Sequence, residues 1–328
     1  MISKIFEKDN PLLWFLWPLL LIILWIPSIF FYTPTIKVDS LGLIYYAFQI
    51  ILKPNWLPGT ITFLVVLFQG YYLKYIFSKH SLVNSNSFYV PLIYCLTLSL
   101  MQFEIILNPF LFAFVFLLFA FDRLLELGKE IRKFTVFEAS ILIGIAVILS
   151  HNLIYFILTA WIALLLFKSA KIKEWIRPLI GLIIPLLYVF TYWIWQDKFI
   201  TQINLIFIKE LKPTIQFNIP SGSQQVTILW LIIVTILSIS SFSKFLSSNI
   251  IRTKNSHLFF IWVLIVGVIS TILTSFQLSS LLIITSLIST SFFTILATTT
   301  RKKWIIDTLI LTAIILLLAN SAINLNYL

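Results

Sequence analysis

Long apolar runs recur along the whole chain, and they limit its fold more than any other feature. Of the 328 residues, 60% are hydrophobic and 11% are charged, whereas soluble domains carry about 25% charged residues. A run of about 18 apolar residues can cross the hydrocarbon core of a bilayer as a helix. A membrane β-barrel would instead show alternating segments of about 10 residues, and this pattern is absent from the sequence. The sequence therefore predicts an all-α protein that crosses the membrane several times.

The basic residues indicate which way these helices run. Lys and Arg are enriched in the loops on the cytoplasmic side of a membrane, and most of the 23 Lys and Arg residues fall on one side when the N-terminus is placed inside. We therefore expect a polytopic bundle of about 11 helices in one transmembrane domain, residues 1–328, with the N-terminus inside and the C-terminus outside.

The net charge of +11 raises the question of nucleic-acid binding. The basic residues are scattered at helix ends rather than gathered in one patch, and membrane topology together with anionic lipid contact accounts for them. The sequence therefore predicts the lipid bilayer as a partner and no nucleic acid.

Residues 87–175 are expected to form two tight hairpins of short apolar helices. A charged helix with the sequence DRLLELGKEIRK, beginning at Asp122, joins the hairpins. Acidic and basic residues are mixed along it at helical spacing, so we expect a solvated face partly helped by local ion pairs. Its basic residues place it inside, and the two hairpin tips then lie outside. Such short helices must thin the bilayer, tilt little or pack against neighbours that span it.

Each hairpin tip holds polar residues that apolar helices do not need. Glu104 lies near the first tip, close to membrane depth, where an ionisable group is costly and by default a functional candidate. The simpler explanation is that Glu104 reaches the headgroup layer at the turn. His151 and Asn152 form the second tip. They suit a polar turn between two helices, and the functional alternative is contact with a phosphate or a sugar.

Asp39 lies in the first outer loop, residues 33–58, just before a stretch that suits a helix lying in the membrane interface. The simpler explanation is that Asp39 caps this helix. Asp39 and Glu104 are the acids of the first two outer loops, and a carboxylate can act as general base for a hydroxyl acceptor. Two carboxylates can also hold a divalent metal ion. The spacing of cysteine and histidine predicts no metal site, and no cofactor is identified.

Three blocks of the sequence carry a first resemblance. They are the opening MISKIFEKDNPLLWF and the blocks that begin DRLLELGKEIRKFTVFEAS and EWIRPLIGLIIPLLYVF. Together they resemble an uncharacterised family of polytopic inner-membrane proteins from bacteroidete-type bacteria, which has no assigned activity. The resemblance covers most of the chain, and it implies the inner (cytoplasmic) membrane of a bacterium as the location.

The layout is also similar to that of integral-membrane glycosyltransferases of the C superfamily. Those enzymes have a first span, an outer loop with interfacial helices and then short hairpins, an order that residues 1–200 share. Residues 201–328 add a second outer loop and four C-terminal helices. The resemblance implies a lipid-linked sugar donor and an acid in the first outer loop, which Asp39 would match, with Glu104 as the second acid. The family's acid usually follows the first span directly, often in a pair, whereas here a single acid follows several residues later.

The sequence leaves three functional hypotheses open. Because only the first of them is an enzyme, the sequence does not decide whether the protein is one. The first is a transfer of sugar from a polyprenyl-phosphate donor at the outer face during envelope biogenesis, with His151 and Asn152 contacting the substrate. The second is a non-catalytic membrane subunit of an envelope assembly or export system, which would bind other membrane proteins. A small-solute transporter comes third, because such a protein needs polar residues in mid-membrane and broken helices in paired positions, and the sequence is poor in both.

Overall fold

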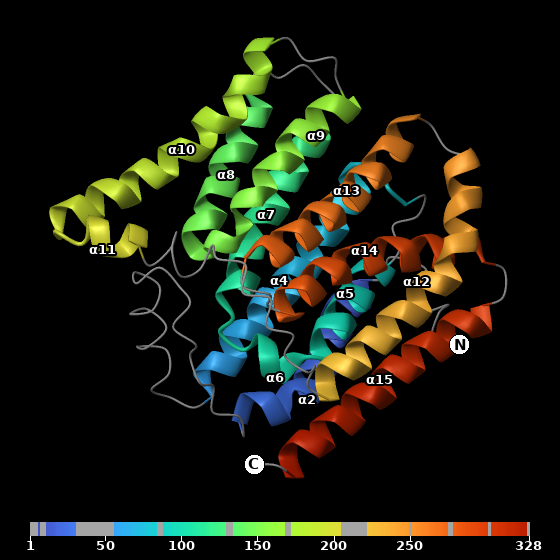
Figure 1. Cartoon of the computed structure of the whole chain (residues 1–328). Coiled ribbons are helices and arrows are strands. Elements are labelled where there is room, and N and C mark those ends of the chain that lie inside the picture. The colour runs from blue at the N-terminus through green and yellow to red at the C-terminus, as the bar shows by residue number, and fades with distance from the viewer. Residues whose placement is uncertain are drawn as a thin grey trace.

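The computed structural model (Figure 1) describes residue 6 and residues 11–30, 56–83, 88–128, 134–167, 172–204, 222–248, 251–274, 278–300 and 303–326. Within these residues the regular structure is helical and contains no strand, so the prediction of an all-α protein is confirmed there. Six helices are long and apolar enough to cross a membrane. They are α2 (Pro11–Phe30), α4 (Leu57–Lys79), α10 (Ile172–Trp195), α13 (Ile251–Leu273), α14 (Leu278–Thr299) and α15 (Lys303–Asn326).

The other described helices are shorter or less uniformly apolar. They are α5 (Tyr89–Ser99), α6 (Gln102–Ile105), α7 (Pro109–Glu126), α8 (Thr135–Leu149), the 3-10 helix η1 (His151–Phe156), α9 (Ile157–Phe167), α11 (Phe199–Asn204) and α12 (Gly222–Ser248). A helix occupies each range where the sequence predicts a span, but among the described residues only the six helices above could cross a membrane by length and composition. The prediction of about 11 spanning helices, with the N-terminus inside and the C-terminus outside, stays a prediction.

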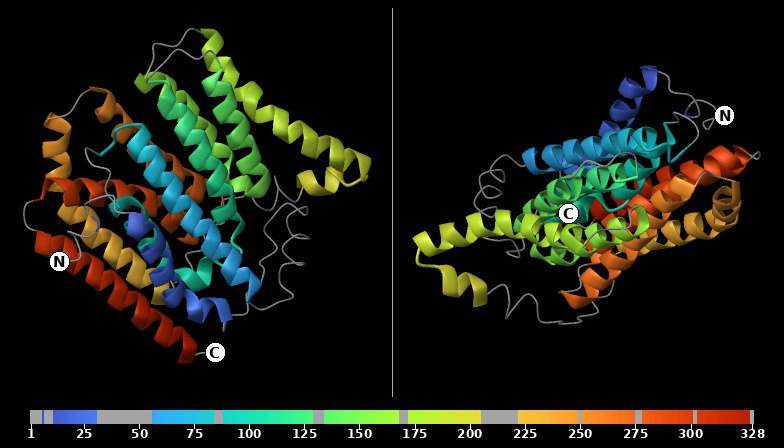
Figure 2. Two further views of the ribbon diagram at one scale, coloured as in Figure 1. Left: turned by 180° about the vertical axis from the view of Figure 1, so that it is seen from behind. Right: turned by 90° about the horizontal axis from the view of Figure 1, so that it is seen from above.

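Helix ends gather at two opposite ends of the bundle (Figures 1 and 2). We call one the basic end, where α4, α7 and α9 finish and α8, α10 and α13 begin. It contains Lys79, Arg123, Arg177, Arg252 and Lys303. We call the other the tip end, where α2, α8 and α10 finish, α4 and α7 begin, and α6 and η1 lie. It contains Trp56, Glu104, Asn108, His151 and Trp195.

The short helix α5 lies at the centre of the molecule, and all of its residues are buried. Its 11 residues extend for about 16 Å, too short to cross a hydrocarbon core of about 30 Å alone. Helices α4, α14 and α15 pack around it. Gln69 of α4 accepts a hydrogen bond of 2.8 Å from the Tyr94 hydroxyl of α5 and donates one of 2.7 Å to the Leu111 carbonyl of α7. Packing against longer neighbours is thus the way this short helix is accommodated.

Close contact between α8 and α10 depends on glycine. A Cβ atom on Gly181 would lie 2.7 Å from the Ser140 Cβ atom, and one on Gly144 would lie 2.9 Å from the Pro185 Cγ atom. Small residues let helix backbones approach closely in membranes, where lipid supplies little hydrophobic drive for helix association. The two helices run parallel, and α10 lies at the edge of the bundle with α11 folded back at its end (Figure 2).

Candidate functional site

The first predicted hairpin tip is a break in the helical chain around α6. Helix α5 ends at Ser99, and α6 adds four residues that include Glu104. The chain then reverses through Leu107, whose φ of 52° lies in the left-handed region. The Asn108 side chain accepts a hydrogen bond of 2.9 Å from the Phe110 amide, and Pro109 occupies the first turn of α7. An asparagine cap followed by proline is a favourable helix start, so the sequence itself ends the turn here.

Side chains of two other helices, α2 and α15, hold this break in place. The Trp25 indole of α2 donates a hydrogen bond of 2.8 Å to the Ser99 hydroxyl, and Ser28 of α2 donates one of 3.3 Å to Gln102. The Asn320 amide of α15 donates 2.7 Å to the Leu100 carbonyl. These bonds satisfy polar groups that lie where water is excluded.

The chain reversal at Leu107 lies beside the second turn of α4, counted from the start of that helix at the tip end. The Leu107 amide donates a hydrogen bond of 3.1 Å to the Thr62 hydroxyl of that helix. Thr62 follows the first residue of α4, Leu57, by five residues, so the reversal lies about 7 Å inside the start of α4. Glu104 is half-buried there, and its Oε2 atom is buried. Glu104 thus lies at a turn, and its depth in a membrane stays a prediction.

The second predicted tip forms η1. His151 and Asn152 are buried, and the Ser270 hydroxyl of α13 donates a hydrogen bond to the Asn152 carbonyl. The element packs against α8, α9 and α13, whereas α6 packs against α2 and α5. The structure therefore places Glu104 and His151 at the same end of the bundle but in different packing environments. Asp39 lies outside the described residues.

Metal-ligating side chains do not cluster in the described segments. No group of three or more His, Cys, Asp and Glu side chains lies close enough together there to hold a metal ion. The predicted pair of Asp39 and Glu104 falls outside this test, because residues 31–55 are not among those described.

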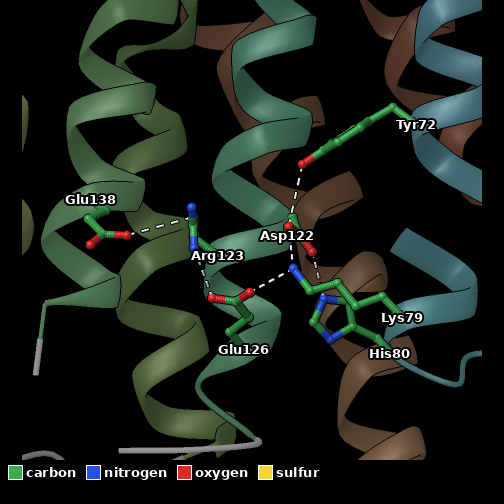
Figure 3. A network of polar contacts seen from close by, with 7 residues as sticks. All are labelled: Tyr72, Lys79, His80, Asp122, Arg123, Glu126 and Glu138. Atoms are coloured by element: carbon green, nitrogen blue, oxygen red, sulfur yellow. Dashed lines mark hydrogen bonds and ion pairs between the residues drawn. The ribbon is translucent and has the colours of Figure 1, made fainter. Parts of the chain in front are cut away.

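A cluster of charged side chains at the basic end was not predicted (Figure 3). The Asp122 carboxylate of α7 receives His80 Nε2 at 2.8 Å on Oδ1 and Lys79 Nζ at 2.7 Å on Oδ2. The Tyr72 hydroxyl donates to the same Oδ2 atom at 3.4 Å. Lys79 also pairs with Glu126 at 2.6 Å. A buried carboxylate on α7 thus binds the last turns of α4.

The cluster continues outward to α8. Arg123 Nη1 lies 3.3 Å from Glu126, and Arg123 Nε lies 3.7 Å from Glu138 at the start of α8. Exposure rises along this path, from 1% for the His80 side chain to 50% for that of Glu138. The cluster therefore leads from the protein interior to the surface and joins the ends of three helices.

Burial and hydrogen bonding act in opposite directions on the acids of this cluster, which lie beyond the apolar run of α7. Burial alone would raise the pKa of the Asp122 carboxyl, but hydrogen bonds from His80 and Lys79 outweigh it and hold that pKa below its usual range. Burial would likewise raise the pKa of Glu126, and its hydrogen bond to Lys79 lowers the pKa instead. Both groups are therefore carboxylates at neutral pH.

The expectation of a solvated charged helix from Asp122 onward is wrong at Asp122. Helix α7 continues without a break to Glu126, and Asp122 is only 5% exposed. Its partners come from α4 and its C-cap residue, 42 to 50 residues earlier in the chain, so local spacing did not reveal them. One signal was present: Asp122 follows Leu118 and Phe114 at intervals of four residues, and both are fully buried. Helical periodicity places Asp122 on that buried face.

Comparisons of the chain with protein-family models, with curated proteins and with solved structures found no match. Neither resemblance suggested by the sequence is tested by them. In its described part the chain is helical, and six of its helices are suited to crossing a membrane.

Proposed function

We propose that the protein is an integral enzyme of a bacterial inner membrane that transfers sugar from a polyprenyl-phosphate donor to an acceptor at the tip end of the bundle. The observation that carries the proposal is the position of Glu104. It is a half-buried acid at a helix break, and hydrogen bonds from Trp25 to Ser99 and from Ser28 to Gln102 hold that break beside α2. Ionisable residues at membrane depth are costly and mark functional sites by default.

The end of α2 connects Glu104 to the other candidate acid. Asp39 follows Phe30, the last residue of α2, by nine residues, a span of at most about 30 Å when extended. Because α2 contacts α6, this length of chain is enough for Asp39 to reach Glu104 in the proposal. In the proposal, Asp39 removes the proton from the acceptor hydroxyl, and Glu104 orients the acceptor or shares a divalent metal ion with Asp39.

The charge distribution supports the side on which this site would work. Arg123, Arg177, Arg252 and Lys303 lie at the basic end, whereas Lys198 lies near the tip end. Because basic residues favour the cytoplasmic side, the tip end faces outward in the proposed orientation. An outward site is where a lipid-linked sugar would meet an envelope acceptor.

Allele replacement in the native host tests this function. Glu104→Gln and Asp39→Asn each remove one acid, and we expect both variants to reach normal membrane levels while the transferred glycan falls by about 100-fold or more. Glu138→Gln is the matched control, because it removes a half-exposed acid at the opposite end. Normal glycans and normal lipid-linked sugars in both acid variants, alongside a defect in the deletion strain, would rule the enzyme out.

A non-catalytic membrane subunit of an envelope assembly is the second candidate, and the placement of His151 and Asn152 favours it. Both side chains are buried between α8, α9 and α13 rather than gathered beside Glu104, as a shared substrate site would require. This candidate expects Asp39 and Glu104 to tolerate substitution. It also expects one membrane protein to co-purify with the wild-type chain and to be lost when exposed residues on a helix surface are replaced.

A further inference from the structure

Exposed aromatic side chains lie near both ends of α10, which is at the edge of the bundle (Figures 1 and 2). Trp175 is in its first turn, and Trp195, its last residue, is 90% exposed. Between them the exposed residues are mainly aliphatic, including Ile180, Ile183 and Leu187, and the exposed Tyr188 and Tyr192 lie in the last two turns. The two tryptophans are 20 residues apart, about 30 Å along a helix, which matches the thickness of a hydrocarbon core.

Helix α4 repeats this arrangement at the same spacing. Trp56, directly before the helix, and Tyr75 in its penultimate turn are exposed, and they are 19 residues or about 28 Å apart. The exposed residues between them include Leu64 and Phe68. Two helices in different parts of the bundle thus show an apolar outer face of nearly equal length that ends in aromatic rings.

We propose that these rings mark the two planes at which the protein meets the lipid headgroups. The inner plane passes through Tyr75 and Trp175 at the basic end, and the outer plane passes through Trp56 and Trp195 at the tip end. Tryptophan and tyrosine favour headgroup depth because one part of each ring system is apolar and another part forms hydrogen bonds.

Two further helices agree with the inner plane. The exposed Trp14 of α2 stacks on Tyr71 with ring centroids 5.1 Å apart, and Lys74 Nζ lies 4.3 Å from the centre of the Trp14 ring. Both partners lie within a turn of Tyr75. Trp304 is the second residue of α15 at the basic end, and it is exposed as well.

The polar residues that follow the outer plane fit a chain leaving the hydrocarbon. Gln196, Asp197 and Lys198 come directly after Trp195, and Asp197 has a φ of 53° that turns the chain back into α11. Ile200 of α11 is exposed. The end of α10 and α11 therefore occupy the outer headgroup layer, where apolar and polar side chains are both satisfied.

One exposed tryptophan lies away from both planes and provides an internal control. Trp262 is 11 residues into α13, about 16 Å from its start, so the proposal places it near the middle of the hydrocarbon core. Depth should therefore follow position along a helix and not residue type.

Depth-dependent fluorescence quenching of the full-length protein in phosphatidylcholine vesicles tests these planes. Cys95 is the single cysteine and is 1% exposed, so a thiol-reactive fluorophore will label an introduced cysteine selectively. The variants are Trp175→Cys, Ile183→Cys, Trp195→Cys and Trp262→Cys. Spin-labelled lipids carry the quencher either at the headgroup or deep in the acyl chain, and iodide reports exposure to water.

We expect the shallow lipid to quench the labels at positions 175 and 195 more strongly, and the deep lipid to quench those at 183 and 262. If Trp195→Cys is poorly produced, Ile194→Cys reports the same plane. A label at 195 that iodide quenches and neither lipid quenches would show that α10 ends in water or against another protein. That outcome, or equal depths at 175 and 183, would overturn the proposal. Neither result depends on the proposed sugar transfer.

Discussion

A single carboxylate, that of Asp122, determines how the ends of α4 and α7 meet. It is buried, and its two oxygen atoms form hydrogen bonds with the side chains of two consecutive residues, Lys79 and His80. Burying a charge costs several kcal/mol unless close partners offset the loss of water. These partners offset it, and they fix the register between the two helices at the basic end.

Replacing Asp122 with asparagine should destabilise the protein by about 2 kcal/mol, because Lys79 loses one of its two carboxylate partners in a partly buried position. The measurement is unfolding of the purified protein in detergent. Glu138→Gln is the control, and it should change the free energy of unfolding by no more than about 0.5 kcal/mol, since Glu138 is half-exposed. Equal stability of the two variants would contradict the role assigned to Asp122.

Stability should also fall in acid. The lowered pKa values of Asp122 and Glu126 mean that the folded state holds these groups as carboxylates more strongly than the unfolded state does. Their contribution is therefore complete above their ordinary pKa values of 3.8 and 4.5, and it is lost as the pH falls through the lower folded-state values. The free energy of unfolding, measured across this range, should fall as the pH falls. The double variant Asp122→Asn, Glu126→Gln should show a smaller dependence on pH. An unchanged slope would assign the acid sensitivity to other groups.

At the scale of elements, α8 and α10 pack as closely as they do because each has a glycine at the contact. The Gly181 position faces the Ser140 Cβ atom and the Phe137 carbonyl oxygen, and the Gly144 position faces Pro185. These neighbours are backbone or short side chains, which cannot move aside without shifting a helix.

Gly181→Ala should therefore separate the helices and cost about 1–3 kcal/mol, although alanine is the better helix former. Thermal unfolding in detergent measures the change. Gly222→Ala is the matched control, because nothing lies within 4 Å of a Cβ atom there, and it should be neutral to within about 0.5 kcal/mol. A Gly181→Ala protein as stable as the wild type would show that α10 packs more loosely than described.

At the scale of the whole molecule, α2 and α15 from opposite ends of the described chain meet at the break between α5 and α7. Trp25 of α2 and Asn320 of α15 bond to Ser99 and Leu100, which are neighbours in the chain. The break that contains Glu104 is therefore positioned by helices from both ends of the described chain. A distant C-terminal substitution can thus disturb this site.

Asn320→Ala should lower stability by about 1 kcal/mol, the range measured for hydrogen bonds between membrane helices, and should reduce any activity that depends on Glu104. Thr312→Ala is the control, since that hydroxyl bonds only to the Leu309 carbonyl within its own helix. Unfolding and the glycan assay on the same preparations check both effects. If the Asn320→Ala protein kept normal stability and activity, α15 would have no role in positioning the break that contains Glu104.

Apolar composition and run length alone determined the all-α class of the described residues, because helix formation in lipid satisfies the backbone locally. Which six of these helices are long and apolar enough to cross a membrane came from the structure. The sequence also contained the Asn108-Pro109 start of α7. Only the tertiary structure decided that Asp122 is buried, that Glu104 and His151 have different neighbours, and that α15 bonds to the end of α5. These outcomes depend on contacts between residues 42 to 220 positions apart, and no local pattern specifies which helices will meet.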